Sequence, residues 1–223
     1  DSLRQGGKVL AAETGKAFQA IFSDSDWAFY IQGDEVIHEK YLPVIKEAMQ
    51  KWKDDKSVEG LLFNYRHFYG SYDYVGDSTR WYRKEIRIIK NDRSISSYKD
   101  AQGFRKNDQK LRVKSIDAVI YHYGWVKPPS KQQAKQESFH KMWHGDEWLK
   151  KNILKTNEFD YSQVDSLKKF EGMHPQVMLE RIRKKNWAFS FDPSQKKLSI
   201  KHRLLMFIQN KTGWRPGEYR NYK

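Results

Sequence analysis

The segment from Trp27 to Glu35 constrains the fold of this chain more than any other part of its sequence. Its first five residues, Trp27–Ile31, are apolar or aromatic without interruption, and two carboxylates follow at Asp34 and Glu35. A short continuous apolar run is typical of a strand that is buried on both faces of a parallel sheet. In open α/β sheets, ligands bind beyond the carboxyl ends of such strands. The segment therefore predicts a buried strand that ends in two acidic side chains at the edge of a binding site.

A helix start is the alternative interpretation of the same two carboxylates. Asp34 can cap a following helix, and Glu35 would then lie in its first turn, where negative charge is favourable. If the chain is extended instead, adjacent side chains point in opposite directions. One carboxylate would then face the ligand, where it can hold Mg²⁺ or Mn²⁺, and the other would anchor the loop.

The composition excludes several classes of protein. The 223 residues include no cysteine, which rules out disulfides, thiolate metal sites and cysteine nucleophiles. No stretch reaches the roughly 18 consecutive apolar residues of a membrane-spanning helix, and no signal peptide is recognisable. A chain of this length can form one large domain or two small ones. We therefore expect a cytoplasmic protein with a sizeable core.

The net charge of +14 is concentrated in residues 80–223, whereas residues 1–79 hold more acidic than basic side chains. A basic surface attracts polyanions through long-range electrostatics. The sequence therefore predicts an anionic partner, and it leaves open nucleic acid, anionic lipid headgroups and phosphorylated ligands.

The hydrophobic pattern predicts helices and strands that alternate along the chain. The expected helices cover residues 8–22, 40–52, 130–151, 164–170, 175–185 and 198–209. The expected strands cover residues 27–31, 60–69, 81–89 and 113–123. This order predicts an α/β fold with a mixed sheet. A doubly wound sheet normally has strands before the one at residues 27–31, and we expect those strands to be missing from this chain.

Three further aspartates and one histidine carry side chains that chemistry at such a site would use. Asp100 lies close to a tyrosine and a glycine and can act as a general base, but it can equally be a turn aspartate that bonds its own backbone. Asp73 and Asp77 lie in a loop rich in tyrosine and glycine and are rival bases. His122 follows an apolar strand, where a histidine is either a metal ligand or a structural residue.

Four segments, taken together, resemble parts of the family 2 glycosyltransferases. Trp27–Glu35 resembles the strand and acidic motif of that family, which is usually written Asp-x-Asp and followed by another acid. The pattern from Gly7 to Phe22 is similar to the helix before that strand. Tyr82–Lys90 resembles an arginine-containing strand of cell-envelope members, and Val119–Tyr123 resembles their Ile-x-His-Tyr segment. The order of the segments agrees with the family over about residues 7–130.

The resemblance implies a GT-A fold, which is a Rossmann-like three-layer sandwich with a mixed sheet. Residues 1–150 would form this glycosyltransferase core without its N-terminal strands. Residues 151–223 would be a C-terminal helical extension packed on the core. The implied activity is inverting transfer of a sugar from a nucleotide-sugar donor to a hydroxyl of a glycan or lipid-linked acceptor. The expected setting is synthesis of bacterial cell-surface polysaccharide in the cytoplasm, with peripheral contact to the anionic inner face of the membrane.

The resemblance also assigns roles to single residues. The donor-binding residues would be Gln32, Asp34 and Arg87. The ligands of Mg²⁺ or Mn²⁺ would be Asp34 and His122. The catalytic base would be Asp100 or, alternatively, Asp73 or Asp77. Gln32 departs from the family pattern, because its amide stands where the first acid is expected and supplies no charge.

Two other functions compete with the transferase. The basic half with its interleaved aromatic residues can belong to a non-enzymatic protein that binds nucleic acid or another polyanion. Nucleic-acid binding explains neither the acidic strand end nor the ordered segments, so we do not expect nucleic acid as the partner. The glutamine at position 32 also favours an inactive transferase-like domain.

Overall fold

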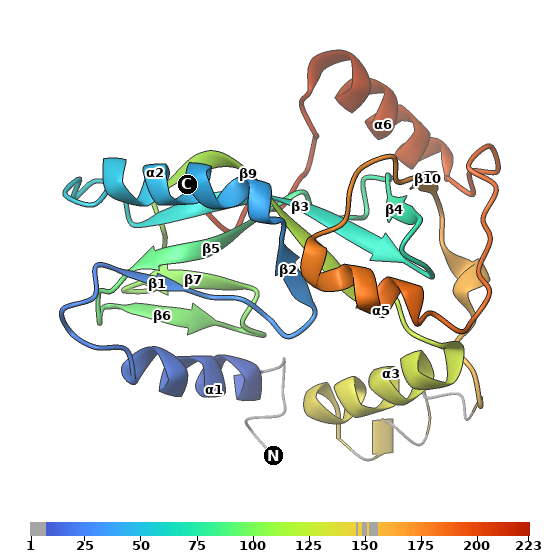
Figure 1. The fold of residues 1–223 in the computed structure, drawn as a ribbon, viewed down its shortest axis with the longest axis horizontal. Coiled ribbons are helices and arrows are strands. Elements are labelled where there is room, and N and C mark those ends of the chain that lie inside the picture. Colours follow the sequence, from blue (N-terminus) through green and yellow to red (C-terminus); the bar gives the residue numbers. More distant parts are fainter. Residues whose placement is uncertain (1–7, 146, 149–150, 152–155) are drawn as a thin grey trace.

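A curled mixed sheet of seven strands forms the centre of the fold in the computed structural model (Figure 1). The structure describes residues 8–145, 147–148, 151 and 156–223. The two long central strands, β3 (Gly60–Tyr69) and β9 (Val113–Trp125), pair in parallel. The other described pairs of this sheet are antiparallel. The result is an α/β fold with a mixed sheet, as the order of the predicted elements indicated.

Five shorter strands complete this sheet. They are β1 (Trp27–Phe29), β2 (Glu35–Ile37), β4 (Tyr74–Gly76), β5 (Lys84–Lys90) and β10 (Leu167–Lys169). β5 pairs with β3 and carries β1 on its other side, whereas β2 pairs with β9. β4 pairs with the far end of β3, and β10 pairs with β4.

A second, three-stranded antiparallel sheet follows β5 in the chain. It consists of β6 (Ile95–Tyr98), β7 (Gly103–Lys106) and β8 (Gln109–Lys110). The turn from β6 to β7 holds Lys99 and Ala101 at φ of 54° and 60°, in the left-handed region. Sequence periodicity assigned no element to this segment, because its strands are only four residues long or shorter.

Helices and the small sheet cover the two faces of the central sheet. α2 (Leu42–Lys51), which follows the 3₁₀ turn η2 (Glu39–Tyr41), packs Ile45 and Ala48 onto one face. α1 (Lys8–Gln19) and the small sheet pack on the other face through Phe18 and Phe104. These contacts give three layers of secondary structure around β3 and β5.

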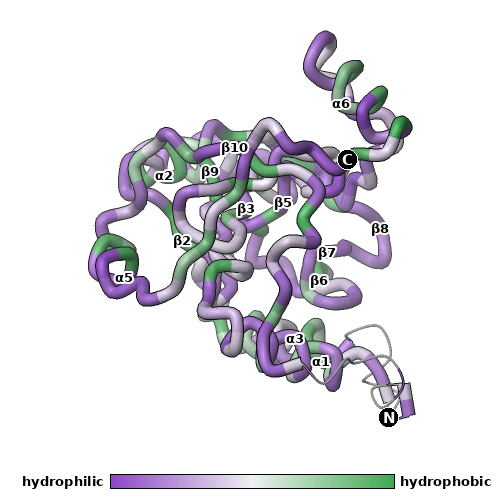
Figure 2. The backbone as a smooth tube through the Cα atoms, turned by 90° about the vertical axis from the view of Figure 1, so that its right-hand side faces the viewer, coloured by the Kyte–Doolittle hydropathy of each residue, from purple (hydrophilic) through white to green (hydrophobic). Residues whose placement is uncertain are grey.

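The other helical elements whose bounds the described residues define lie after β9. They are α3 (Pro129–Trp143), η3 (Tyr161–Gln163), η4 (Gln176–Met178), α5 (Leu179–Arg183) and α6 (Ile200–Thr212). Figure 1 and Figure 2 show, from two directions, that α6 stands out from the body of the molecule. No helix among the described residues is long and apolar enough to cross a membrane.

Most elements expected from periodicity are present, and two expectations are corrected. Residues 164–170 do not form a helix, because Leu167–Lys169 pairs with β4 as strand β10. The helix expected over 130–151 ends at Trp143; residues 146, 149 and 150 of that range lie outside the described residues. Residues 151–223 also contribute β10 to the central sheet, so this part of the chain is not purely helical.

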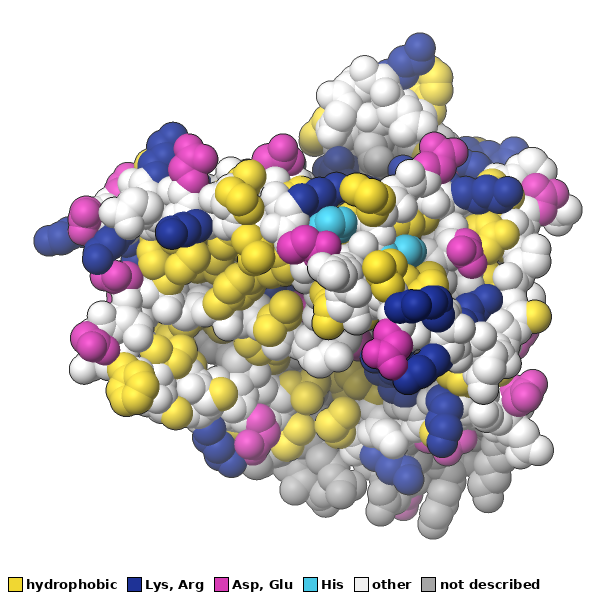
Figure 3. Space-filling view, viewed as in Figure 1, with side chains coloured by type: hydrophobic (Ala, Val, Ile, Leu, Met, Phe, Trp, Pro, Cys, Tyr) yellow, Lys and Arg dark blue, Asp and Glu magenta, His cyan; other side chains and the backbone are white. Residues whose placement is uncertain are grey.

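The strand at Trp27 differs from its prediction. β1 has three residues and pairs antiparallel with β5, and it has no second partner among the described residues. Phe29, at the end of β1, is 43% exposed, and Ile31, in the loop after it, is 47% exposed, whereas the prediction had both buried. Figure 3 shows hydrophobic side chains gathered between α2 and α1, where β1 runs. The helix-cap interpretation of Asp34 is also wrong, since Asp34 leads directly into strand β2.

Candidate functional site

The loop between β1 and β2 carries the acidic motif, and backbone hydrogen bonds hold both of its ends. The Tyr30 N–H donates to the Arg87 carbonyl at 2.8 Å, which ties the start of the loop to β5. The Tyr123 N–H donates to the Asp34 carbonyl at 2.8 Å, which ties the end of the loop to β9. The loop therefore spans from one side of the sheet to the other with Asp34 fixed beside β9.

Glu35 anchors this loop from inside the core. Arg87 donates to its two carboxylate oxygens, from Nε to Oε2 at 2.8 Å and from Nη2 to Oε1 at 2.6 Å, and the Tyr65 hydroxyl donates to Oε1. The side chains of Arg87 and Glu35 are 1% and 0% exposed. A bidentate pair in such surroundings fixes orientation strongly. Glu35 is thus the anchoring carboxylate that an extended chain requires, and Asp34 is left to face the site.

The expectation that Arg87 contacts the donor needs correction. Its guanidinium is buried under Tyr30 and Tyr65 and is engaged by Glu35, so no face of it is open to a ligand. Gln32 also serves the loop itself, because its Nε2 donates to the Tyr30 hydroxyl at 3.1 Å and its backbone N–H donates to Glu35.

Asp34 lies between a lysine and a histidine. Lys135 of α3 donates from Nζ to Oδ2 at 2.8 Å, and Nε2 of His122 in β9 is 3.7 Å from Oδ1. Burial opposes ionisation of this carboxyl, but hydrogen bonding and charge from His122 and Lys135 outweigh it and hold the pKa of Asp34 well below its usual range. Asp34 is therefore a carboxylate at neutral pH, and it lies beside His122, the other residue that the resemblance assigned to the metal.

His67 of β3 fixes the tautomer of His122, because the sheet register sets the two residues opposite each other. His67 is 3% exposed, and burial lowers its pKa well below the ordinary value, so its ring is neutral. Its Nε2 lies 3.1 Å from the Tyr82 carbonyl, which can only accept a hydrogen bond, so this nitrogen carries the proton. Its Nδ1 then accepts from Nδ1–H of His122, at 3.1 Å. In its neutral form, His122 therefore turns the lone pair of Nε2 toward Asp34.

Asp34 and His122 suit two ligands of one divalent cation. Ligands about 2.1 Å from a metal are about 3.0 Å apart at right angles and about 4.2 Å apart on opposite sides. The 3.7 Å between Oδ1 and Nε2 lies inside that range. No group of three or more His, Cys, Asp or Glu side chains that could hold a metal occurs among the described residues. Substrate oxygens and water would have to complete the coordination, as is usual for Mg²⁺.

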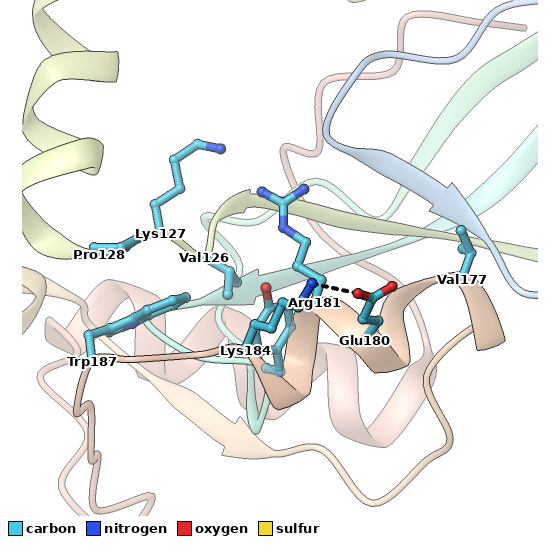
Figure 4. Close-up of a pocket in the computed structure, with 9 residues that line it drawn as sticks. Val126, Lys127, Pro128, Val177, Glu180, Arg181, Lys184 and Trp187 are labelled. Carbon is cyan, nitrogen blue, oxygen red and sulfur yellow. Dashed lines mark hydrogen bonds and ion pairs between the residues drawn. The ribbon is translucent and has the colours of Figure 1, made fainter.

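A basic pocket of about 370 Å³ lies between α5 and the segment that leads into α3 (Figure 4). Figure 4 shows Lys127 projecting from the segment that leads into α3, Arg181 from α5, and Lys184 from the C-cap position at the end of α5. Burial lowers the pKa of Lys127, and the charges of Lys135 and Arg181 lower it further, whereas Asp34 raises it. Lys127, which lines the pocket, therefore lies within electrostatic reach of Asp34. The pocket's surplus of cations can bind phosphate groups.

The three candidate bases lie apart from Asp34, and none has a hydrogen bond to Asp34 or His122 in the described part of the chain. Asp73 is exposed in the turn between β3 and β4 and accepts from Ser71 Oγ at 2.9 Å. Asp77 is engaged by Ser166 and by Lys196, at 3.0 Å from Nζ. Asp100 lies in the turn between β6 and β7, near Glu85.

Sequence reasoning missed four residues of this site, which are His67, Lys127, Lys135 and Arg181. The strongly basic composition of residues 80–223 was a signal for the three cations, but it did not locate them. No family model matches this chain, and no curated protein matches it.

Proposed function

We propose that this chain is an inverting glycosyltransferase with a GT-A fold, which moves a sugar from a nucleotide-sugar donor to a hydroxyl of a glycan or lipid-linked acceptor. Bacterial cell-surface polysaccharide synthesis is the proposed setting. The observation that carries the proposal is the 3.7 Å separation between Oδ1 of Asp34, at the end of the β1–β2 loop, and Nε2 of His122 in β9. The acidic motif and the Ile-x-His-Tyr segment, which are far apart in sequence, meet there.

Asp34 and His122 would hold Mg²⁺ or Mn²⁺. Such a cation offsets negative charge on the departing nucleoside diphosphate. Lys135 orients the Asp34 carboxylate by occupying Oδ2, which leaves Oδ1 directed at His122. Lys127 and Arg181, which line the basic pocket, would bind phosphate oxygens of the donor, and the charge of Asp34 reaches Lys127. Fixed cations aimed at developing charge are the main contribution a protein makes to such a transfer.

Asp100 stays our prediction for the general base, with Asp73 and Asp77 as alternatives. The base would accept the proton of the acceptor hydroxyl as that oxygen bonds to the anomeric carbon and the bond from that carbon to the diphosphate breaks. Of the three, Asp77 is the least suited, because Ser166 and Lys196 already engage its carboxylate.

A thermal-shift panel of UDP-, GDP-, CMP- and dTDP-sugars, with and without Mn²⁺, tests the proposal. A donor at about 100 times its Kd stabilises the fold by about 2.7 kcal/mol. We expect one donor class to raise Tm in the presence of Mn²⁺ and Asp34→Asn to abolish the shift. Asp117→Asn is the matched control, because Asp117 is an exposed aspartate in β9.

Three results would contradict this function in different ways. If no nucleotide sugar changes Tm, or if Asp34→Asn responds as the unmodified chain does, the site does not bind a donor through Asp34. Salt-sensitive binding of mixed oligonucleotides without any response to donors would favour the polyanion-binding alternative. Donor binding without transfer to any acceptor would favour the inactive transferase-like domain.

A further inference from the structure

Helix α6 exposes a row of apolar side chains on the face that points away from the protein. Ile200, Leu204 and Phe207 are 87%, 59% and 60% exposed. Their spacing of four and three residues sets them in one stripe along the helix. None of the three belongs to a buried cluster. Exposing so continuous an apolar surface to water is unfavourable, and such a stripe is typical of an interaction site.

The opposite face of α6 attaches the helix to the core. His202 Nδ1 is 2.8 Å from the Thr79 hydroxyl, and Met206 is 8% exposed. Beyond the helix, Arg215 binds the Gln209 side chain at 2.6 Å. Residues 202, 206 and 209 lie on the reverse of the stripe, so the core contacts hold the stripe outward. Figure 1 and Figure 2 show the helix standing clear of the sheet and its covering helices.

Positive charge surrounds the apolar stripe. No Asp or Glu occurs from Pro193 to Gly217, and this stretch carries six basic residues. Lys201 and Arg203 lie on opposite flanks of the stripe, and Lys211 continues it by one turn. No ion pair involves these three side chains in the part of the chain that the structure describes. Trp214, just beyond the helix, is 57% exposed.

We propose that α6 lies on the surface of an anionic lipid bilayer, with Ile200, Leu204 and Phe207 inserted among the lipids and with Lys201, Arg203 and Lys211 at the headgroups. An apolar face, cationic flanks and an exposed tryptophan are the features of an interfacial helix. A nucleic acid would match the charge but would leave the apolar stripe in water. A second copy of α6 would cover the stripe but would bring like charges together. The proposal is independent of the glycosyltransferase function.

Vesicle sedimentation with the whole chain tests the proposal. The probes are vesicles of phosphatidylcholine alone and vesicles with about 30% phosphatidylglycerol, each at low and high salt. We expect binding to the anionic vesicles that weakens with salt. Replacing Lys201 and Arg203 by glutamine should lower the partition coefficient about 30-fold, since each cation near the surface contributes about 1 kcal/mol. Replacing the exposed lysines Lys46 and Lys131 in the same way should change it little.

A second set of variants separates the stripe from exposed apolar residues in general. The triple variant Ile200→Ser, Leu204→Ser, Phe207→Ser should lose at least a hundredfold in partition, because about 1.5–3 kcal/mol accompanies burial of each apolar side chain. The control Phe22→Ser, Leu42→Ser, Met173→Ser changes residues that are 81%, 55% and 70% exposed but scattered over the surface. It should bind as the unmodified chain does. Circular dichroism and Tm should change little for the stripe variant, since all three side chains are more than half exposed and belong to no buried cluster.

Three outcomes would overturn the proposal. The first is an absence of binding to anionic vesicles by the unmodified chain. The second is a negative result for the stripe variant, which would then bind vesicles as tightly as the unmodified chain. The same outcome follows if the unmodified chain forms a concentration-dependent dimer in sedimentation velocity and the stripe variant does not, because the stripe would then bind a second copy. The third is tight oligonucleotide binding that depends on Lys201 and Arg203 but not on the stripe.

Discussion

Replacing Glu85 with glutamine should remove a pH dependence of stability that this one carboxyl imposes on the fold. Glu85 is 4% exposed in β5. Its Oε1 accepts from Gln102 Nε2 at 3.2 Å, and its Oε2 has no hydrogen-bond partner among the described residues. Burial raises the pKa of Glu85 to about 8, against the opposing effects of Arg87 and Gln102, and the charges of Glu35 and Asp100 add to the rise. The folded chain therefore holds a protonated carboxyl at neutral pH.

The magnitude follows from proton linkage. Between the ordinary pKa of 4.5 and about 8, the unfolded chain has released this proton and the folded chain still binds it. The free energy of unfolding therefore falls by about 1.4 kcal/mol for each pH unit in this window. The stabilising contribution is complete below pH 4.5 and is lost by about pH 8. From about pH 5 to pH 8, the loss amounts to about 4 kcal/mol.

Urea unfolding of the two proteins across this pH range measures the effect. Glutamine keeps an oxygen that accepts from Gln102, and it does not titrate. The free energy of unfolding of Glu85→Gln, relative to that of the unmodified chain, should therefore rise by about 4 kcal/mol from pH 5 to pH 8. The two proteins share all other titrating groups, so the contributions of those groups cancel in the difference between the two free energies of unfolding. The exposed Glu47→Gln serves as the matched control and should show no such trend. A difference that stays constant with pH would show that Glu85 is already ionised in the fold.

Two further predictions concern the anchor and the histidine pair. Arg87→Met should lower the free energy of unfolding in urea by about 3–5 kcal/mol, because it leaves Glu35 buried without its partner. Adding Glu35→Met should restore the stability, and a double variant that recovers no stability would contradict this reason. His67→Phe should weaken Mn²⁺-dependent donor binding about 10- to 100-fold, since His122 loses the acceptor that sets its tautomer. Calorimetric titration measures that loss, and unchanged affinity would remove His67 from the site.

The fold was predictable where sequence periodicity and packing agree. Gly60–Tyr69 has the aromatic and apolar residues of a central strand, and its predicted bounds match β3. β10 was missed because Val164, Leu167 and Phe170 are spaced as on a helix, whereas its hydrogen bonds come from β4, about 90 residues earlier. The burial of β1 was overestimated, because an apolar run does not reveal how many neighbouring strands a strand pairs with.

Within the candidate site, the resemblance assigned Asp34 and His122 to one metal, and the structure sets them close together because β2, which begins one residue after Asp34, pairs with β9 at His122. His67 was not predictable, because only the parallel register of β3 against β9 sets it opposite His122. Lys135 was not predictable either, since the packing of α3 decides which of its lysines reaches Asp34. The roles of Arg87 and Glu35 depend on burial, which a charge pattern does not reveal.

Glu35, which is buried in an ion pair with Arg87, directly follows the partly buried Asp34 in the sequence, and this order has a mechanical reason. Desolvation makes a buried ion pair a poor source of net stability, so position is the more direct explanation for this one. Glu35 is the register partner of His122, and His122 is the partner of His67, so one row across three strands carries both the anchor and the histidine pair. Any shift of the anchor would move Asp34 relative to His122. The short separation between these two side chains is therefore maintained by the buried Glu35–Arg87 pair and by His67, which lie behind them.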